Sequence, residues 1–153
     1  MKILNGLQNL VLMVVVAVAL SGCSLLKGGK GEEVELRINV DEQVNPDELG
    51  RSSPIVLRLY ELKKEVATDG LDFFSVYDQT GSEFEAAVSS MKEFQVNPGQ
   101  AIVQTILTDV STKHLMIVAA FKDIDNSQWK VMHDLEESDE LTIAIEGKTI
   151  IKQ

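Results

Sequence analysis

The most regular pattern along the chain is an alternation of apolar and polar residues over positions 33–40. Every second residue from Val34 to Val40 is apolar, and the residues between them are charged or carry an amide. In an extended chain, successive side chains point to opposite faces, so this spacing predicts a strand with one buried face.

Further segments combine β-branched, aromatic and aliphatic residues in the same way, and these cover residues 55–62, 92–96, 100–107, 114–121, 129–135 and 141–146, the last with a continuation through Ile150. Residues 115–121 are apolar on both faces, which predicts a central strand covered by a second sheet on one side and by a helix on the other. About seven short strands separated by turns predict a mainly β fold, a two-sheet β-sandwich.

The period changes between residues 71 and 91, where apolar positions recur every three to four residues. This spacing predicts a small helical insertion of two short helices. Asp69 or Asp72 could cap the first helix. Ser82, with Glu85 three residues later, matches a capping box for the second.

The first 31 residues contain no acidic residue and include an apolar run of eleven residues, 10–20. This length is typical of a signal peptide, whereas a membrane-spanning helix needs about 20 apolar residues. The run ends in Leu20, Ser21, Gly22 and Cys23, the sole cysteine, and these four residues resemble the lipobox of bacterial lipoproteins. The competing interpretation is a buried cysteine in a core segment.

The lipobox resemblance implies removal of residues 1–22 as a signal peptide and acylation of Cys23, with S-diacylglycerol and an N-acyl chain. Residues 23–32 then form a glycine-rich, lipidated tether, and residues 33–153 form the folded domain. Two or more acyl chains give stable anchoring. Ser24, in place of an aspartate after the cysteine, resembles the pattern that directs lipoproteins to the outer membrane.

The acidic net charge of the chain limits the classes of partner that it can bind. The chain has 14 Lys and Arg against 24 Asp and Glu, a net charge of -10, and every carboxylate lies from Glu32 onward. Removing residues 1–22 makes the net charge about -11, because Lys2 is lost. Nucleic-acid binding needs a basic face, and stacking on bases or sugars needs aromatic residues, which make up 5% of the chain. We therefore expect no nucleic-acid partner.

Candidate chemistry is sparse. His114 and His133 have no partner at metal-ligand spacing, so we expect no metal site and interpret both as hydrogen-bonded histidines on strands. The Gly147–Thr149 segment lacks the earlier glycine of a phosphate loop, and residues 123–128 lack the glycine of a calcium loop. No nucleophile or paired acid and base stands out, so we expect no enzyme and no cofactor besides the lipid.

Residues 45–62, which read NPDELGRSSPIVLRLYEL, resemble the Asn-Pro-Asp…Gly-Arg-(Pro/Ser)-Ser-Pro segment of the outer-membrane lipoproteins of type VI secretion systems, the TssJ (VasD-like) family. Further blocks agree in order: Asp72–Asp78 (DFFSVYD), Glu93–Gly99 (EFQVNPG), and His114–Asp125 (HLMIVAAFKDID) followed by Trp129-Lys130. With the lipobox, the resemblance covers nearly the whole chain.

This resemblance implies a transthyretin-like β-sandwich on the periplasmic face of the outer membrane. It also implies a partner, the C-terminal periplasmic domain of the inner-membrane IcmF-like protein TssM, and other membrane-complex subunits. The family uses the loop between the first two strands, here residues 41–54. The candidate contact residues in that loop are Asn45, Pro46, Asp47, Leu49, Gly50, Arg51, Ser53 and Pro54.

Two interpretations of this loop stay open. Asp47 and Arg51 could be polar contacts to the partner, or they could fix the loop to its own domain through turn hydrogen bonds and an ion pair. Elsewhere, we expect Phe73, Phe74 and Tyr77 to be core residues. Trp129 is expected to pack inside the domain, although it could anchor an interface.

A function of another class is a periplasmic lipoprotein that binds a small ligand between its sheets. Such a site requires a concave, mostly apolar pocket with a few convergent polar groups. The sequence shows no such set of residues, but the structure can reveal one.

Overall fold

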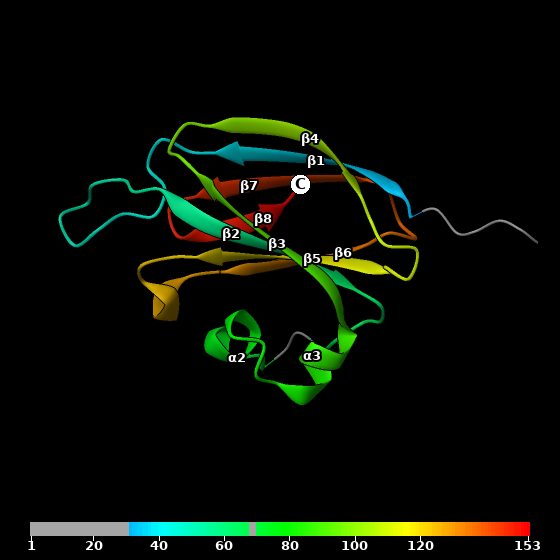
Figure 1. Ribbon diagram of the computed structural model, residues 1–153. Coiled ribbons are helices and arrows are strands. Elements are labelled where there is room, and N and C mark those ends of the chain that lie inside the picture. The colour runs from blue at the N-terminus through cyan, green and yellow to red at the C-terminus, as the bar shows by residue number, and fades with distance from the viewer. Residues whose placement is uncertain (1–30, 68–69) are drawn as a thin grey trace, which may run out of the picture. The chain divides into compact units, whose positions relative to one another are not determined.

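The computed structural model describes residues 31–67 and 70–153, which fold as two packed four-stranded sheets (Figure 1). The first sheet has the order β4-β1-β7-β8, with β1 Glu33–Val40, β4 Ala101–Leu107, β7 Glu140–Glu146 and β8 Thr149–Lys152. The second has the order β3-β2-β5-β6, with β2 Ile55–Leu62, β3 Val88–Val96, β5 His114–Ala120 and β6 Lys130–Asp134. The predicted mainly β sandwich is confirmed.

The alternation in β1 places its apolar face between the sheets. Val34, Leu36 and Ile38 are fully buried there, and they pack in one cluster with aliphatic residues of β2, β5 and β7. Burying each such side chain stabilises the fold by about 1.5–3 kcal/mol. β1 pairs antiparallel with β4 and parallel with β7, so it is an interior strand of its sheet.

β5 is buried on both faces, as its sequence predicts. Leu115, Ile117 and Ala119 pack in the core between the sheets, whereas Met116 and Val118 pack in a second cluster beneath the helices. β5 lies between β2 and β6 in the second sheet. The central position explains why polar residues are missing from both sides of this strand.

Two short helices, α2 Phe73–Tyr77 and α3 Ser82–Ala87, cover the outer face of the second sheet (Figure 1). Asp72 caps α2 by accepting a hydrogen bond from the Ser75 backbone at 2.9 Å; Asp69, the other candidate, lies outside the described residues. In the described residues, no helix has both the length and the apolar character needed to span a membrane.

The predicted capping box is wrong. The N-cap residue of α3 is Gly81, which has no side chain that could cap the helix. Ser82 is the first helical residue and therefore does not occupy the N-cap position that a capping box requires. The helix is also shorter than predicted, because β3 begins at Val88. There the chain pairs with Leu62 across a bulge, and the Ser89 hydroxyl donates to the Glu61 carbonyl at 3.0 Å. Pairing with β2 thus overrides the local helical spacing.

The C-terminal strand is likewise divided where the sequence suggested continuity. Gly147 has φ of 55°, a left-handed conformation that glycine adopts without steric cost, and it turns the chain into β8. Ile150 therefore lies on β8, antiparallel to Ile145 of β7. The fold has eight described strands for this reason.

Candidate partner-binding face

The loop of residues 41–54, between β1 and β2, projects from one end of the sandwich (Figure 1). Its neck is fixed by Asn45, which is 3% exposed and has φ of 48°. The Asn45 amide donates to the Pro54 carbonyl at 2.9 Å and accepts from the Lys122 backbone at 2.8 Å. Its own backbone N–H donates to the Gly147 carbonyl at 2.7 Å. Asn45 thus joins the two ends of the loop and ties the loop to two other segments of the domain.

Further bonds close the same neck. The Ser53 backbone donates to the carbonyl of Val44, a fully buried residue, at 3.2 Å. The Ser52 hydroxyl donates to the Glu42 carbonyl at 2.6 Å, and the Lys122 ammonium donates to the Ser53 hydroxyl at 2.6 Å. The two arms of the loop are therefore held together and held against the domain.

The tip of the loop is organised by Asp47. Its carboxylate accepts from the backbone N–H groups of Leu49 and Arg51, both at 2.9 Å, and from the Arg51 guanidinium at 2.8 Å. These bonds, above all those from Arg51, lower the pKa of the Asp47 carboxyl. Gly50 lies between them at φ of 76°, where a side chain would be strained.

The side chains of the tip differ in exposure. Leu49 is 76% exposed, and the Arg51 side chain is 73% exposed, whereas the Asp47 side chain is 20% exposed. The loop-fixing interpretation of Asp47 and Arg51 therefore describes real bonds. Those bonds leave about three quarters of both the Arg51 and the Leu49 side chains accessible to a partner.

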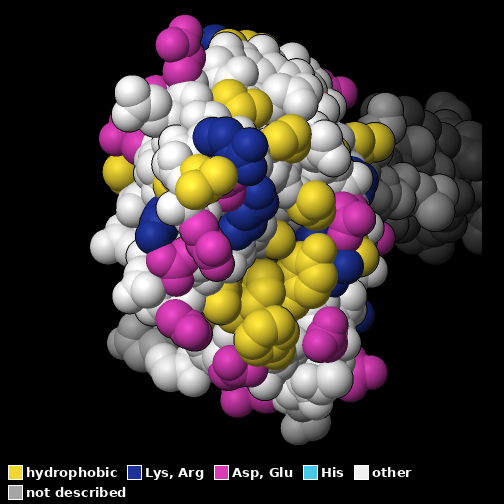
Figure 2. All heavy atoms as spheres, turned by 90° about the vertical axis from the view of Figure 1, so that its left-hand side faces the viewer, with side chains coloured by type: hydrophobic (Ala, Val, Ile, Leu, Met, Phe, Trp, Pro, Cys, Tyr) yellow, Lys and Arg dark blue, Asp and Glu magenta, His cyan; other side chains and the backbone are white. Residues whose placement is uncertain are grey.

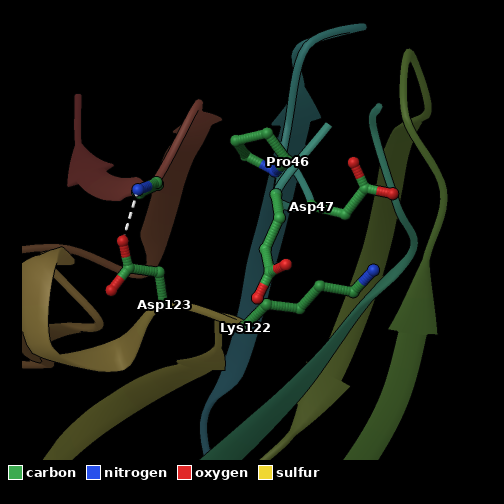
Figure 3. A pocket seen from close by; sticks show the side chains of 6 residues that line it. Pro46, Asp47, Lys122 and Asp123 are labelled. Atoms are coloured by element: carbon green, nitrogen blue, oxygen red, sulfur yellow. Dashed lines mark hydrogen bonds and ion pairs between the residues drawn. The ribbon is translucent and has the colours of Figure 1, made fainter. Parts of the chain in front are cut away.

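A polar cleft of about 460 Å³ lies beneath the loop. It is lined by Pro46, Asp47, Glu48, Lys122, Asp123 and Lys148 (Figure 3). The Lys148 ammonium pairs with the Asp123 carboxylate, and this hydrogen bond lowers the pKa of Asp123. Both cations and carboxylates therefore line the cleft, which favours polar contacts with a partner.

A smaller cleft of about 260 Å³ lies between α2 and the 3-10 helix Ile124–Asn126 (η2), and it is lined by Leu71, Asp72, Phe73, Phe74, Ile124, Asp125, Ser127 and Trp129. We call it the aromatic cleft. Figure 2 shows a contiguous apolar patch, edged by acidic side chains, on the end of the molecule from which the loop projects. In Figure 1, α2 and η2 lie toward the end from which the loop projects, so the loop tip and the aromatic cleft are on the same side of the domain.

Within the aromatic cleft, Phe73 stacks on Tyr77 at 5.1 Å between ring centroids and meets Trp129 edge to face at 5.3 Å. Phe73, Tyr77 and Trp129 pack against the cluster beneath the helices, as predicted. Phe74 is 59% exposed, so its assignment to the core is wrong. A helix of five residues can direct only one side to the sheet, and Val76 and Phe73 occupy that side.

Sequence reasoning missed Glu61, a charged residue that is 2% exposed in β2. Its carboxylate accepts from the Asp109 backbone at 2.8 Å and the Thr112 hydroxyl at 2.9 Å, and it lies 3.4 Å from the Lys92 ammonium. These bonds fix the connection between β4 and β5. The sequence does place Glu61 at a position where the alternation in this strand expects a buried apolar residue. A single exception of this kind does not change the prediction of a strand, so the burial of Glu61 was not foreseen.

The histidines behave as structural residues. His133 is buried on the edge strand β6, and its Nε2 lies 2.8 Å from the Ser138 carbonyl oxygen. His114 Nδ1 lies 3.8 Å from the Asp134 carboxylate. In the part of the chain that the structure describes, no group of three metal-ligating side chains comes together. The lipobox residues Leu20, Ser21, Gly22 and Cys23 lie outside the described residues.

Solved structures share this fold. The TssJ1 lipoprotein of the Pseudomonas aeruginosa type VI system matches with a TM-score of 0.70 and 28% identity, over 80% of this chain and 97% of that one. A chain of a structure described as "Type VI membrane complex" matches with a TM-score of 0.72 and 20% identity, over 80% and 98%. A chain in the structure of the TssM C-terminal domain (869-1107) from EAEC matches with a TM-score of 0.67 and 20% identity, over 78% and 99%.

No curated protein is significantly similar to this chain in sequence. The family model described as "Type VI secretion lipoprotein, VasD, EvfM, TssJ, VC_A0113" matches residues 32–148, which include every described strand except β8, the loop of residues 41–54 and the aromatic cleft. This chain therefore belongs to the TssJ (VasD) family of type VI secretion lipoproteins.

Proposed function

We propose that this lipoprotein sits on the periplasmic face of the outer membrane and docks the C-terminal periplasmic domain of the IcmF-like protein TssM. Support comes from the family and from two solved structures that contain a chain of this fold. One of them is described as a type VI membrane complex, and the other as the TssM C-terminal domain. The docking surface is the face formed by the tip of loop 41–54 and the aromatic cleft.

The observation that carries this proposal is the contrast between a fixed loop backbone and its exposed side chains. Leu49 and Arg51 protrude from a loop that is already ordered by Asn45 and Asp47. A preformed loop loses little conformational entropy on binding. Exposed arginine and aromatic residues beside a pocket are also the residue types that contribute most to binding energy.

Binding of the partner provides the first test. Residues 31–153 form a compact unit with its own core, so this segment can be titrated with the periplasmic domain of TssM in a calorimeter. We expect a dissociation constant in the micromolar range or below, that is about -8 kcal/mol or stronger. Absence of binding at high micromolar concentrations of both proteins would count against the docking role.

The lipid anchor is a separate part of the proposal. Residues 1–22 are proposed to be removed, Cys23 to carry the acyl chains, and residues 23–32 to link the lipid to the domain. Replacing Cys23 with Ser should leave the fold intact and shift the protein from the outer-membrane fraction to the supernatant after cell disruption. Unchanged outer-membrane attachment of the Cys23→Ser protein would refute this anchor.

The family is one of secretion lipoproteins and not a family of enzymes, and we propose that this chain acts without catalytic turnover. The small-ligand alternative gains no specific support. Two cavities of ligand size, about 460 and 550 Å³, are lined mostly by charged side chains, and the aromatic cleft is smaller, about 260 Å³. Ligand sites usually occupy about 300–1,000 Å³ with mostly apolar walls.

A further inference from the structure

The four edge strands of the two sheets differ in charge. β3 carries Lys92 and Glu93, β6 carries Lys130 and Asp134, and the short β8 carries Lys152. β4 has the sequence AIVQTIL and no charged residue, in a chain with 38 charged side chains. Charged residues on an edge strand hinder pairing with another chain, and β4 lacks this protection.

The opposite side of the sandwich is partly closed, whereas among residues 31–67 and 70–153 no strand pairs with the outer edge of β4. A β-bridge joins Gln128 to Thr149, and the Ile150 backbone donates to the Gln128 carbonyl at 2.9 Å, so β8 is linked to the chain that enters β6. β4 pairs with β1 on one side only, and Figure 1 shows it at the outer edge of its sheet.

Alternate residues of β4 form backbone hydrogen bonds with β1, and the backbone groups of the other residues are free to bond to another strand. The Val40 backbone donates to Gln100 and the Thr108 backbone donates to Glu32, so the even-numbered residues of β4 bond to β1. In an antiparallel ladder the bonding residues alternate. The N–H and C=O groups of Ala101, Val103, Thr105 and Leu107 therefore point away from β1, toward a potential new strand.

The side chains of the same residues lie on the outer face of the sheet and are accessible. Val103 is 61% exposed and Leu107 is 62% exposed, two of the more exposed large apolar residues of the described chain. β4 therefore offers both free backbone groups and uncovered apolar area.

We propose that β4 pairs antiparallel with β4 of a second copy of this chain, around a two-fold axis at Gln104. In this register Val103 faces Thr105 of the other copy, and Ala101 faces Leu107. Each pair exchanges two backbone hydrogen bonds, and the two first sheets join into one continuous sheet.

A second copy fits this edge because β4 carries no charge, so pairing it with itself buries no charge and places no like charges opposite each other. The negative net charge of each copy, about -11 once residues 1–22 are removed, would oppose association elsewhere, but β4 itself is neutral. If the proposed lipid anchor holds both copies in one membrane, their effective concentration rises and a modest contact suffices.

Disulfide trapping of the full-length chain in membranes tests this contact. In the proposed register residue 104 forms a non-hydrogen-bonded pair with its symmetry mate, with Cα atoms about 4.5 Å apart, which falls within the range of disulfides. The Gln104→Cys chain should form a dimer of twice the mass on mild oxidation. The matched control is Asn39→Cys, on the exposed face of the neighbouring strand β1, which should stay monomeric.

The parent chain is oxidised alongside, so that any dimer through Cys23 is recognised. A dimer band of equal intensity from Gln104→Cys and Asn39→Cys, or from neither, would overturn the proposal. A disulfide from Gln104→Cys to a different protein would also overturn it, because β4 would then pair with another partner.

A second substitution separates β pairing from chance proximity. Thr105 lies opposite Glu35 on β1, so Thr105→Lys can pair with Glu35 within one chain and keep the fold. In the dimer it places a lysine from each copy close together at the new strand junction. In the Gln104→Cys background, Thr105→Lys should lower the dimer yield about tenfold with unchanged circular dichroism. An unchanged yield would contradict the register.

Discussion

Asn45, at the neck of the loop between β1 and β2, is 3% exposed, whereas Leu49, at the tip of the same loop, is 76% exposed. The two residues are close in sequence but differ in what they contact. The Asn45 side chain bonds to Pro54 at the other end of the loop and to the Lys122 backbone, whereas the Leu49 side chain faces solvent. The difference indicates that the neck determines where the loop is and the tip determines what it can bind.

Residues at the neck of the loop should determine the stability of the domain, and Asn45→Ala should have the largest effect on the free energy of unfolding. It leaves the Pro54 carbonyl and the Lys122 N–H without partners and places alanine at a positive φ. We expect the free energy of unfolding to fall by about 2–3 kcal/mol, measured by urea denaturation. The control Asn39→Ala, at an exposed position of β1, should change it by less than about 0.5 kcal/mol. Equal losses for the two variants would break the distinction between neck and tip.

The aromatic cleft should show the same contrast between a buried residue that stabilises the domain and an exposed residue that contacts a partner. Phe73 contacts Tyr77 and Trp129, so Phe73→Ala should destabilise the domain by about 2 kcal/mol in thermal or urea unfolding. Phe74 is 59% exposed, so Phe74→Ala should cost less than about 1 kcal/mol of stability and act mainly on partner binding. The reverse order of stability losses would show that the roles of the two rings are exchanged.

At the tip, Arg51→Ala should weaken binding of the TssM periplasmic domain about tenfold, equivalent to about 1.4 kcal/mol. Its ion pair with Asp47 is largely exposed, so unfolding free energy should change by less than about 1 kcal/mol. Titration calorimetry measures the affinity, and Arg37→Ala on β1, another exposed arginine paired with a carboxylate, serves as the control. A loss of stability without a loss of affinity would make Arg51 a loop-fixing residue only.

The smallest expected effect is a pH dependence confined to the tip. Because the pKa of Asp47 is lower in the folded protein than in the unfolded chain, the carboxylate stabilises the loop above the unfolded pKa, about 3.9. That contribution is lost as the pH falls through the folded pKa. Amide exchange of Leu49 and Arg51, corrected for intrinsic rates, should lose protection below about pH 4. In Asp47→Asn the protection should be weak and flat across this range; an identical pH profile would disprove the role of Asp47.

The sequence predicted the strands correctly where the apolar pattern arises from burial of one or both faces of the strand alone. The alternation in β1 and the uninterrupted apolar run of β5 each match a buried surface, and the sandwich follows from them. The start of β3 at Val88 and the buried Glu61 were not predictable, because both depend on pairing with segments distant in the chain.

The candidate site shows the same limit. A loop with Asn45, Asp47, Gly50 and Arg51 was recognisable as a turn-rich segment, but its bonds to Lys122 and Gly147 depend on how the β-strands are arranged. The aromatic cleft was hidden for the same reason. Its walls come from α2 and from residues 124–129, and only the folded chain brings these segments together.

The docking face is tested most directly by two matched substitutions in one titration. Leu49 and Val110 are both exposed aliphatic residues, 76% and 60% exposed, and Val110 lies in the β4–β5 connection rather than in the proposed docking face. We predict that Leu49→Asp weakens binding of the TssM periplasmic domain at least tenfold, and that Val110→Asp changes it by less than about twofold. Equal effects of the two substitutions, or a loss confined to Val110→Asp, would contradict the assignment of this face.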